Sequence, residues 1–352
     1  MILDNWPKHI DQYLFRLKDD FFQLPYLYNS PQSMIEGIKS LPITKHNAAI
    51  QLISVASAFY RANIYYRKID KGFWILLTNM NIKQNIVTIS SYDKNTFNDY
   101  YFLNLTLFQH KFIIKDSQQI SLLNTSWTFN KPYTEVPNYF YKQTEGKIIS
   151  FAIKKDWIKK MLSSKKSTER KIIIEFLDNK RGFSRWVDIV PNTHDLAREI
   201  SEILQDQNCL NINHIALKKK SKQLIIDFFK NASNDSRFLN NISLSNLDYS
   251  NAAKAEKIIM TNLHLPFLGI ENIAKEVSTS PTKLKVNFKI IYGFSMLNYH
   301  KEKNMLFAKQ LITNPDISIT EIANITGYNS SSRFAASFKK RFGILPSKAR
   351  QY

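Results

Sequence analysis

The chain has 352 residues, of which 44% are hydrophobic and 13% are aromatic, so it can bury sizeable cores and is not disordered by composition. A single cysteine, Cys209, excludes an internal disulfide framework and fits a reducing compartment. The formal charge of +20, from 49 Lys and Arg against 29 Asp and Glu, favours a polyanionic partner such as nucleic acid.

The N-terminal residues predict neither export nor membrane insertion. Residues 1–7 have no basic stretch followed by an apolar core, so we expect no signal peptide. No apolar run approaches the roughly 20 residues needed to span a bilayer. The sequence therefore predicts a soluble cytoplasmic protein with no membrane partner.

The first fifty residues are predicted to be helical and interrupted by prolines. Residues 10–22 have apolar side chains at the spacing of one helix face, namely Ile10, Tyr13, Leu14, Leu17 and Phe21. The segment that follows is interrupted at Pro25, Pro31 and Pro42.

Short β-rich segments dominate residues 48–129. Residues 59–69, a turn at Asp70-Lys71-Gly72 and residues 73–77 predict a hairpin. Further strands are expected at 85–91, 99–108, 111–115 and 119–123, and a β pair at 147–153 and 171–177. Many short strands with few helices favour a sandwich or barrel. After Pro191, apolar stripes predict helices at 194–205 and 212–231, followed by a linker at 231–236 and a helical region from Leu247 onward.

One short pattern occurs twice in the last hundred residues, about 50 residues apart. Each copy contains an Ile-Ala pair, a helix-start signal, an aromatic anchor and a closing glycine: Ile273-Ala274, Ser280-Pro281, Phe288 and Gly293, then Ile322-Ala323, Ser330, Phe338 and Gly343. The order predicts a short helix, a tight turn and a second helix in each copy. This helix-turn-helix arrangement places its second helix in the major groove of DNA.

Local signals define the ends of the helices in both copies. Ser318 and Glu321 form a predicted capping box, and Gly327 suits the left-handed residue past a helix end. Ser280 and Pro281 supply an N-cap and a proline at the first helical position. A helix over residues 296–312, roughly 24 Å long at 1.5 Å per residue, can hold the two reading helices about one DNA turn apart.

The second helix of the second copy has an aromatic face and a basic face. Phe334, Phe338 and Phe342 are expected to point into the core. The opposite face carries small polar and basic side chains suited to base edges and phosphates, namely Ser331, Ser332, Arg333, Ser337, Lys339, Lys340 and Arg341. Residues 245–352 carry 15 basic and 7 acidic residues, a higher density of positive charge than in the rest of the chain.

These residues resemble the AraC/XylS family of bacterial transcription regulators over residues 247–350. The positions that carry the resemblance are Ile273-Ala274, Ser280-Pro281, Leu284, Phe288, Gly293, Tyr299, Ala308, Leu311, Ile319, Ile322-Ala323, Gly327-Tyr328, Phe334, Phe338, Phe342-Gly343, Pro346 and Arg350. The resemblance implies seven helices that hold two helix-turn-helix motifs, with base contacts from the N-terminal half of each reading helix. By this resemblance the base contacts fall on Thr282, Lys285 and Val286, and on Ser331, Ser332, Arg333 and Ala336.

Some positions depart from the family pattern. Val286 and Ala336 stand where relatives often have arginine, so each reading helix lacks one guanine reader. Asn304 stands where the linker helix usually has arginine. The mode of binding therefore transfers from the family, whereas the base sequence that is recognised does not.

The candidate DNA-binding residues are the polar, basic or small residues of the two reading helices. They are Thr282, Lys283, Lys285, Val286, Lys289, Ser330, Ser331, Ser332, Arg333, Ala336, Ser337 and Lys340.

The resemblance also implies that the N-terminal region is a cupin-like β-sandwich that binds a small-molecule effector, with nearby helices forming a homodimer. Nine aromatic residues are numerous enough to line a pocket, although strand alternation equally predicts core or surface packing. They are Tyr65, Tyr66, Phe73, Trp74, Tyr100, Tyr101, Trp127, Phe129 and Tyr139.

We therefore predict an α+β chain of three parts. Residues 1–190 form a β-rich sensor domain, cupin-like or a sandwich; residues 191–245 form a helical linker and dimerisation region; residues 246–352 form an all-α DNA-binding domain of about seven helices. The predicted function is sequence-specific transcription activation on double-stranded promoter DNA, with contact to RNA polymerase. The alternative is a DNA-binding module fused to an enzymatic or protein-docking N-terminal domain.

No catalytic residue, metal site or cofactor is predicted. The seven histidines never fall at metal-ligand spacing with cysteine or carboxylates, and eight glycines leave little room for a phosphate loop. Cys209 raises an alkyl-repair alternative, but it lacks the Pro-Cys-His setting of such chemistry.

Overall fold

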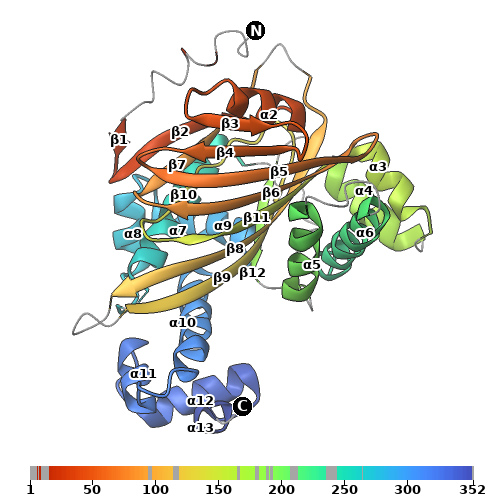
Figure 1. Ribbon diagram of the computed structural model, residues 1–352. Coiled ribbons are helices and arrows are strands. Elements are labelled where there is room, and N and C mark those ends of the chain that lie inside the picture. The colour runs from red at the N-terminus through yellow and green to blue at the C-terminus, as the bar shows by residue number, and fades with distance from the viewer. Residues whose placement is uncertain are drawn as a thin grey trace. The chain divides into compact units, whose positions relative to one another are not determined.

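A computed structural model describes Trp6, Lys8 and residues 16–93, 97–113, 119–164, 167–178, 182–187, 190, 193–206, 213–234, 244–263 and 265–350, with the backbone alone at 110–113, 119–122, 164, 167–168, 187 and 213. These residues form two compact units (Figure 1). The strand-rich unit comprises Met1–Phe108 and Asn124–Tyr249, and the helical unit comprises Gln109–Leu123 and Ser250–Tyr352. None of the described helices is both long enough and apolar enough to pass through a lipid bilayer.

The described residues of the strand-rich unit form two sheets. The larger has eight strands in the order β12-β9-β8-β11-β6-β5-β4-β3: β3 Thr44–Asn47, β4 Leu52–Ala56, β5 Tyr60–Asp70, β6 Phe73–Ile82, β8 Tyr100–Ile113, β9 Gln119–Asn130, β11 Glu145–Lys154 and β12 Phe183–Val187. The smaller has four strands in the order β1-β2-β7-β10: β1 Leu17–Lys18, β2 Phe21–Leu27, β7 Ile86–Ser91 and β10 Asn138–Phe140. The predicted hairpin is confirmed as β5 and β6, with Gly72 at φ 81° in the turn between them.

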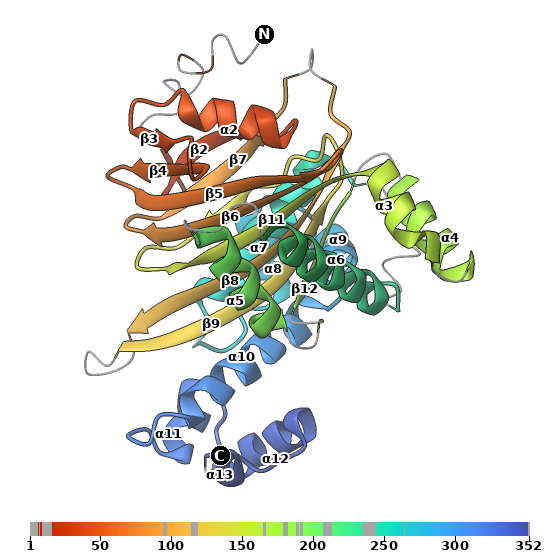
Figure 2. The same cartoon turned by 45° about the vertical axis from the view of Figure 1, so that its right-hand side comes forward.

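Five labelled helices and one 3₁₀ turn accompany the sheets in the described part of the strand-rich unit (Figure 2). They are α2 Pro31–Lys39, α3 Lys155–Met161, the 3₁₀ turn Leu162–Ser164, α4 Ser167–Asp178, α5 Thr193–Gln205 and α6 Asn213–Ala232. Because side chains alternate along a strand, one strand of the larger sheet can contribute to two cores. In β6, Phe73 and Ile75 pack in one cluster with Ile200 of α5 and Phe228 of α6, whereas Leu76 packs in another cluster with α2.

This alternation also divides the nine aromatic residues that were considered for an effector pocket. Phe73, Tyr101, Trp127 and Phe129 belong to the cluster formed with α5 and α6. Trp74 and Tyr100 belong to clusters on the opposite face of the sheet, and Tyr139 contacts Phe21 of the smaller sheet at 5.0 Å between ring centroids. The nine residues therefore do not line one common space. Strand alternation distributes them among separate packed clusters.

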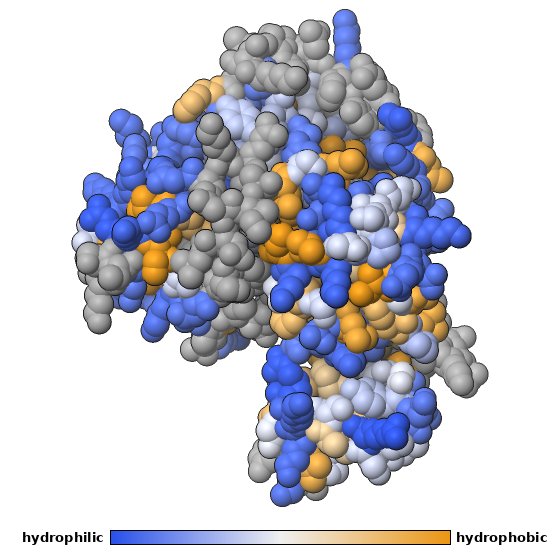
Figure 3. Space-filling model, turned by 180° about the vertical axis from the view of Figure 1, so that it is seen from behind, coloured by the Kyte–Doolittle hydropathy of each residue, from blue (hydrophilic) through white to orange (hydrophobic). Residues whose placement is uncertain are grey.

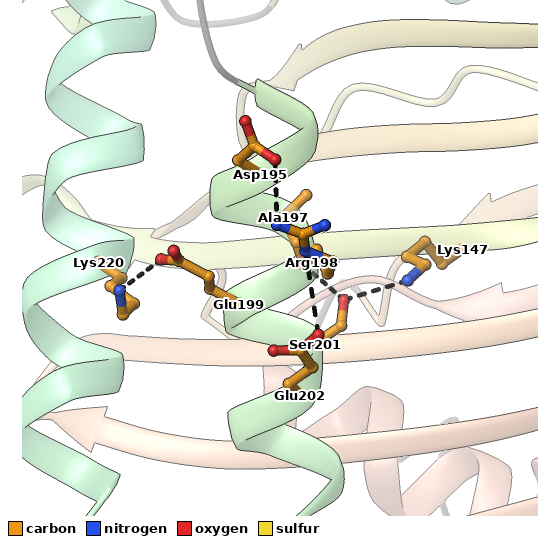
Figure 4. Close-up of polar contacts among 8 residues, drawn as sticks. All are labelled: Lys147, Asp195, Ala197, Arg198, Glu199, Ser201, Glu202 and Lys220. Carbon is orange, nitrogen blue, oxygen red and sulfur yellow. Dashed lines mark hydrogen bonds and ion pairs between the residues drawn. The ribbon is translucent and has the colours of Figure 1, made fainter.

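Helix α5 is joined to α6 and to the sheet by polar contacts (Figure 4). Glu199 forms an ion pair with Lys220 of α6, and Lys147 of β11 donates to the hydroxyl of Ser201 over 3.5 Å. Exposed ion pairs of this kind contribute about 1 kcal/mol or less each. The packing of α5 therefore depends mainly on its buried stripe, which includes Ala197, Ile200 and Leu204.

The helix predicted for residues 10–22 is wrong over its described part. Residues 10–15 lie outside the described residues, and Leu17–Lys18 and Phe21–Leu27 are strands β1 and β2. Asp19 and Asp20 form the turn between them with φ 51° and 63°, a left-handed conformation that cannot continue a helix. Strand β2 is stabilised by parallel pairing with β7, in which Phe22 aligns with Ile86. That partner is more than 60 residues away in the sequence, so local periodicity could not reveal it.

The strand predicted for residues 171–177 is also wrong, because these residues belong to helix α4. Ile173, Phe176 and Leu177 are buried, and they follow the i, i+3, i+4 spacing of a helix face. Lys171 lies 3.9 Å from Glu175, one helical turn later. A short run of isoleucines fits a strand or a buried helix equally well by composition, and the polar partners at helical spacing favour the helix.

The helical unit contains seven helices among the described residues, in agreement with the predicted fold class. They are α7 Asn246–Thr261, which begins in the strand-rich unit, α8 Ile270–Glu276, α9 Pro281–Tyr292, α10 Met296–Ile312, α11 Ile319–Ile325, α12 Ser331–Phe342 and α13 Pro346–Ala349. The helical unit also includes the end of the β8–β9 hairpin. There the Gln310 carboxamide accepts from the Leu123 amide over 2.6 Å and donates to its carbonyl over 2.8 Å.

Candidate nucleic-acid interface

The first helix-turn-helix motif consists of α8 and α9. The Ser280 hydroxyl accepts from the Lys283 amide over 3.3 Å, and Pro281 occupies the first turn, where no amide hydrogen is needed. Gly293 ends α9 in the left-handed conformation at φ 78°. The ends predicted from sequence for this reading helix are therefore confirmed.

The second motif consists of α11 and α12, and its predicted capping box is present. The Ser318 hydroxyl accepts from the Glu321 amide over 3.1 Å, while the Glu321 carboxylate accepts from the Ser318 amide over 2.7 Å. Hydrogen bonding to the carboxylate by the Ser318 amide first, and then by its hydroxyl, stabilises the charged form and lowers the pKa of Glu321. At the start of α12 the Ser330 hydroxyl accepts from the Arg333 amide over 3.2 Å, so Ser330 is an N-cap residue.

The two reading helices match position for position at an offset of 50 residues. The buried positions Leu284 and Phe288 of α9 correspond to Phe334 and Phe338 of α12, and all four side chains are at most 1% exposed. Both helices have a serine N-cap and a left-handed glycine after the last turn. The same face of each reading helix is therefore buried, and the same face is left on the surface.

Helix α10 connects the motifs and contacts both of them. Its Tyr299 packs against Phe288 of α9, with 5.5 Å between ring centroids, and donates from its hydroxyl to the buried Glu256 of α7 over 2.9 Å. Farther along α10, the Asn304 amide donates to the Thr326 carbonyl over 3.4 Å, at the end of α11. Asn304, which stands where the linker helix of the family usually has arginine, is 5% exposed and therefore buried.

The twelve candidate DNA-binding residues lie on α9, on α12 or at the α12 N-cap. Nine are exposed, namely Thr282, Lys283, Lys285, Val286, Lys289, Ser332, Arg333, Ala336 and Lys340. Ser330, Ser331 and Ser337 are of intermediate exposure. Figure 3 shows hydrophilic and hydrophobic residues interspersed on the surface of the part formed by α11, α12 and α13.

For two basic residues of α12, the structure indicates a different role from the one predicted. Lys339 was left out of the candidate set, yet it is exposed and corresponds to Lys289 at the 50-residue offset, a signal that the repeat itself contains. Arg341 was assigned to the DNA-reading face, but its guanidinium binds Glu302 of α10 through three contacts of 2.6–3.0 Å. Arg341 therefore joins α12 to α10, a role that depends on a residue 39 positions earlier.

The turn between the two helices of each motif contains a residue with positive φ. This residue is Gly327 in the second motif, at φ 79°, and Ser278 in the first, at φ 55°. The two turns also share a backbone hydrogen bond. The Tyr328 amide donates to the Ala323 carbonyl over 2.8 Å, and the Thr279 amide donates to the Ala274 carbonyl over 3.0 Å. A left-handed conformation costs an L-residue about 1–2 kcal/mol, whereas glycine adopts it freely.

We therefore predict that Ser278→Gly stabilises the helical unit and that Gly327→Ala destabilises it, each by about 1 kcal/mol. A Cβ at position 327 would meet no atom within 4 Å, so the cost there is conformational rather than steric. Thermal unfolding followed by circular dichroism should register opposite shifts of about 4–8 °C for a domain of this size. A lower melting temperature for Ser278→Gly would contradict the argument.

A family model described as a helix-turn-helix domain matches residues 273–352. The chain is 34% identical to the HTH-type transcriptional regulator ExsA of Pseudomonas aeruginosa over 27% of this chain and 34% of ExsA. It is 37% identical to the virulence regulon transcriptional activator VirF of Yersinia enterocolitica over 23% of this chain and 30% of VirF.

A shorter relative is matched over most of its length. The chain is 32% identical to the probable transcription factor PqrA of Proteus vulgaris over 23% of this chain and 67% of PqrA. The chain thus spans about a third of the length of ExsA and of VirF and two thirds of PqrA.

Proposed function

The chain belongs to the AraC/XylS family of transcription regulators through its C-terminal helix-turn-helix domain, and on that premise we propose that it binds promoter DNA sequence-specifically by inserting α9 and α12 into adjacent major grooves. The repeated reading helix carries this proposal. Two helices of the same length bury the same face and leave the same polar and basic face exposed, 50 residues apart. A helical bundle with no nucleic-acid partner has no need to repeat its surface in this way.

Electrophoretic mobility shift with duplexes from upstream of the chain's own gene and its neighbours tests the proposal directly. We expect a discrete complex that survives an excess of unrelated duplex, because base contacts add to the phosphate contacts. Genome-wide DNA occupancy would then identify the operators. If binding to every duplex were equally weak, the proposed sequence-specific function would be wrong.

The exposed lysines of the reading helices predict a strong dependence of DNA affinity on salt. Each phosphate that is neutralised contributes roughly −0.9 to the slope of log affinity against log salt concentration. We expect Lys285→Ala to reduce the size of that slope by about one while weakening binding to all sequences alike.

The matched control is Lys83→Ala, which removes a lysine of the strand-rich unit whose ammonium donates to the Ser57 carbonyl over 2.8 Å. This variant should keep the wild-type slope. Equal slopes for wild-type protein and Lys285→Ala would remove Lys285 from the interface.

We further propose that the regulator is an activator that contacts RNA polymerase and is controlled by its strand-rich unit, which would bind an effector and form a homodimer. VirF, to which the chain is similar, is named as an activator. Strands β8 and β9 run from the strand-rich unit into the helical unit, where Gln310 of α10 binds the backbone of Leu123. A change in those strands would thus reach the helix that connects the two motifs.

A thermal-shift screen of metabolites, followed by DNA-affinity measurements with each hit, tests this control. A metabolite that raises the melting temperature and changes operator affinity supports an effector; a partner protein that does so instead supports a docking domain. The alternative of an enzymatic N-terminal domain depended on Cys209, which lies outside the described residues. The family is one of transcription factors rather than enzymes.

A further inference from the structure

One exposed apolar side chain stands in the middle of the polar surface of α9. Val286 is 53% exposed, in the second turn of the helix. Residues at i, i+4 and i+7 share one side of a helix, so Thr282, Val286 and Lys289 lie in one row. That row belongs to the face that the proposed function directs into the major groove.

The second reading helix repeats this row 50 residues later. Ser332, Ala336 and Lys339 occupy the corresponding positions of α12, and all three are exposed. In both helices the row therefore consists of a small hydroxyl residue, an apolar residue and a lysine. A lone exposed valine is common on protein surfaces, but the same order on two reading helices is a property of the repeat.

The row contains none of the side chains that read adenine by paired hydrogen bonds. Asparagine and glutamine do so in the major groove. Helix α12 has neither residue, and the single asparagine of α9, Asn287, is 8% exposed and belongs to the buried side. What the two apolar positions offer to a base pair is a contact between carbon atoms.

Only one group in the major groove of unmodified DNA matches such a contact, the C5-methyl of thymine. Resting on the proposed function, we propose that Val286 and Ala336 each contact a thymine methyl, so that the operator has one methyl-read thymine in each of two adjacent major-groove segments. This assigns a base to the two positions where relatives often have arginine and where this chain lacks that guanine reader.

The test uses the full chain and DNA selected from a randomised duplex library. In the selected duplex that binds most tightly, each thymidine is replaced in turn by deoxyuridine, which removes only the methyl group of the base. Wild-type protein should lose about fourfold in affinity at one thymine in each half of the site, the loss expected for one buried carbon. Thymines elsewhere in the duplex are the internal control.

Val286→Ser should bind the thymine duplex more weakly and should become insensitive to uracil in one half of the site only. Ala336→Ser should become insensitive in the other half. Each substitution, combined with removal of the methyl group, forms a double-mutant cycle between protein and base.

Wild-type binding that is unchanged by every uracil would overturn the inference while leaving DNA binding intact. Unchanged uracil sensitivity in Val286→Ser would overturn the assignment to Val286. Failure to select any duplex would count against the proposed function itself.

Discussion

Phe338→Ala is expected to lower the free energy of unfolding of the helical unit by about 3–5 kcal/mol and to abolish binding to promoter DNA. The Phe338 ring is fully buried, 5.8 Å from the Phe334 ring and 4.6 Å from the Phe342 ring between centroids. Truncation removes the central ring of this row and leaves a cavity that the short α11 and α12 cannot close. Circular dichroism on heating, together with a mobility shift on the operator, measures both consequences.

Two further variants separate lost packing from lost DNA contacts. Phe338→Leu keeps most of the volume and should lose much less stability than Phe338→Ala. Phe288→Ala makes the same truncation at the corresponding, fully buried position of the first motif and should cost a similar amount. A wild-type melting temperature in Phe338→Ala would mean that α12 does not pack through this face.

Arg333→Ala is expected to weaken binding to the selected operator by about 5- to 150-fold and to relax specificity at one base pair. Arg333 is exposed in the first turn of α12, and arginine can bind O6 and N7 of guanine through two hydrogen bonds. Among the candidate residues it is the only arginine. The other arginine of α12, Arg341, binds Glu302 through its guanidinium. Binding to unrelated duplex should change much less, because non-specific affinity comes from phosphate contacts.

Arg341→Ala is the matched control on the same helix. It removes the same side chain and charge, but the guanidinium of Arg341 binds the carboxylate of Glu302. We expect near wild-type operator affinity and a small loss of stability, of about 1 kcal/mol or less for a partly exposed ion pair. Equal losses of affinity in Arg333→Ala and Arg341→Ala would indicate a general effect of charge rather than base reading by Arg333.

The DNA-binding end could be predicted well because its signals are local. A capping box joins two residues three apart, and a left-handed glycine acts within one turn of a helix end. Ser318 with Glu321, Ser280 with Pro281, and the glycines 293, 327 and 343 accordingly have the roles expected of them. Only Ser278 escaped this reasoning, because serine gives no sequence signal for the left-handed turn that it occupies.

The strand-rich unit could be predicted only in outline. Alternation and turn residues identified six of the twelve described strands, namely β5, β6, β7, β8, β9 and β11. The signals for a hairpin such as β5 and β6 lie within about 20 residues. The sequence could not identify pairs such as β2 with β7, or the division of aromatic residues between two faces of one sheet. Strand pairing depends on a partner that is distant in the chain, so the same apolar spacing in residues 10–22 fitted a helix equally well.

The sequence by itself thus determined that two helix-turn-helix motifs exist, where their helices begin and end, and which face of each is polar. The tertiary structure alone decided which side chains remain available on that face. Arg341 is bound by Glu302 of another helix, whereas Arg333 and Val286 stay on the surface. The physical reason is range: caps and turns act over three to five residues, while ion pairs and packing join residues that only the folded chain brings together.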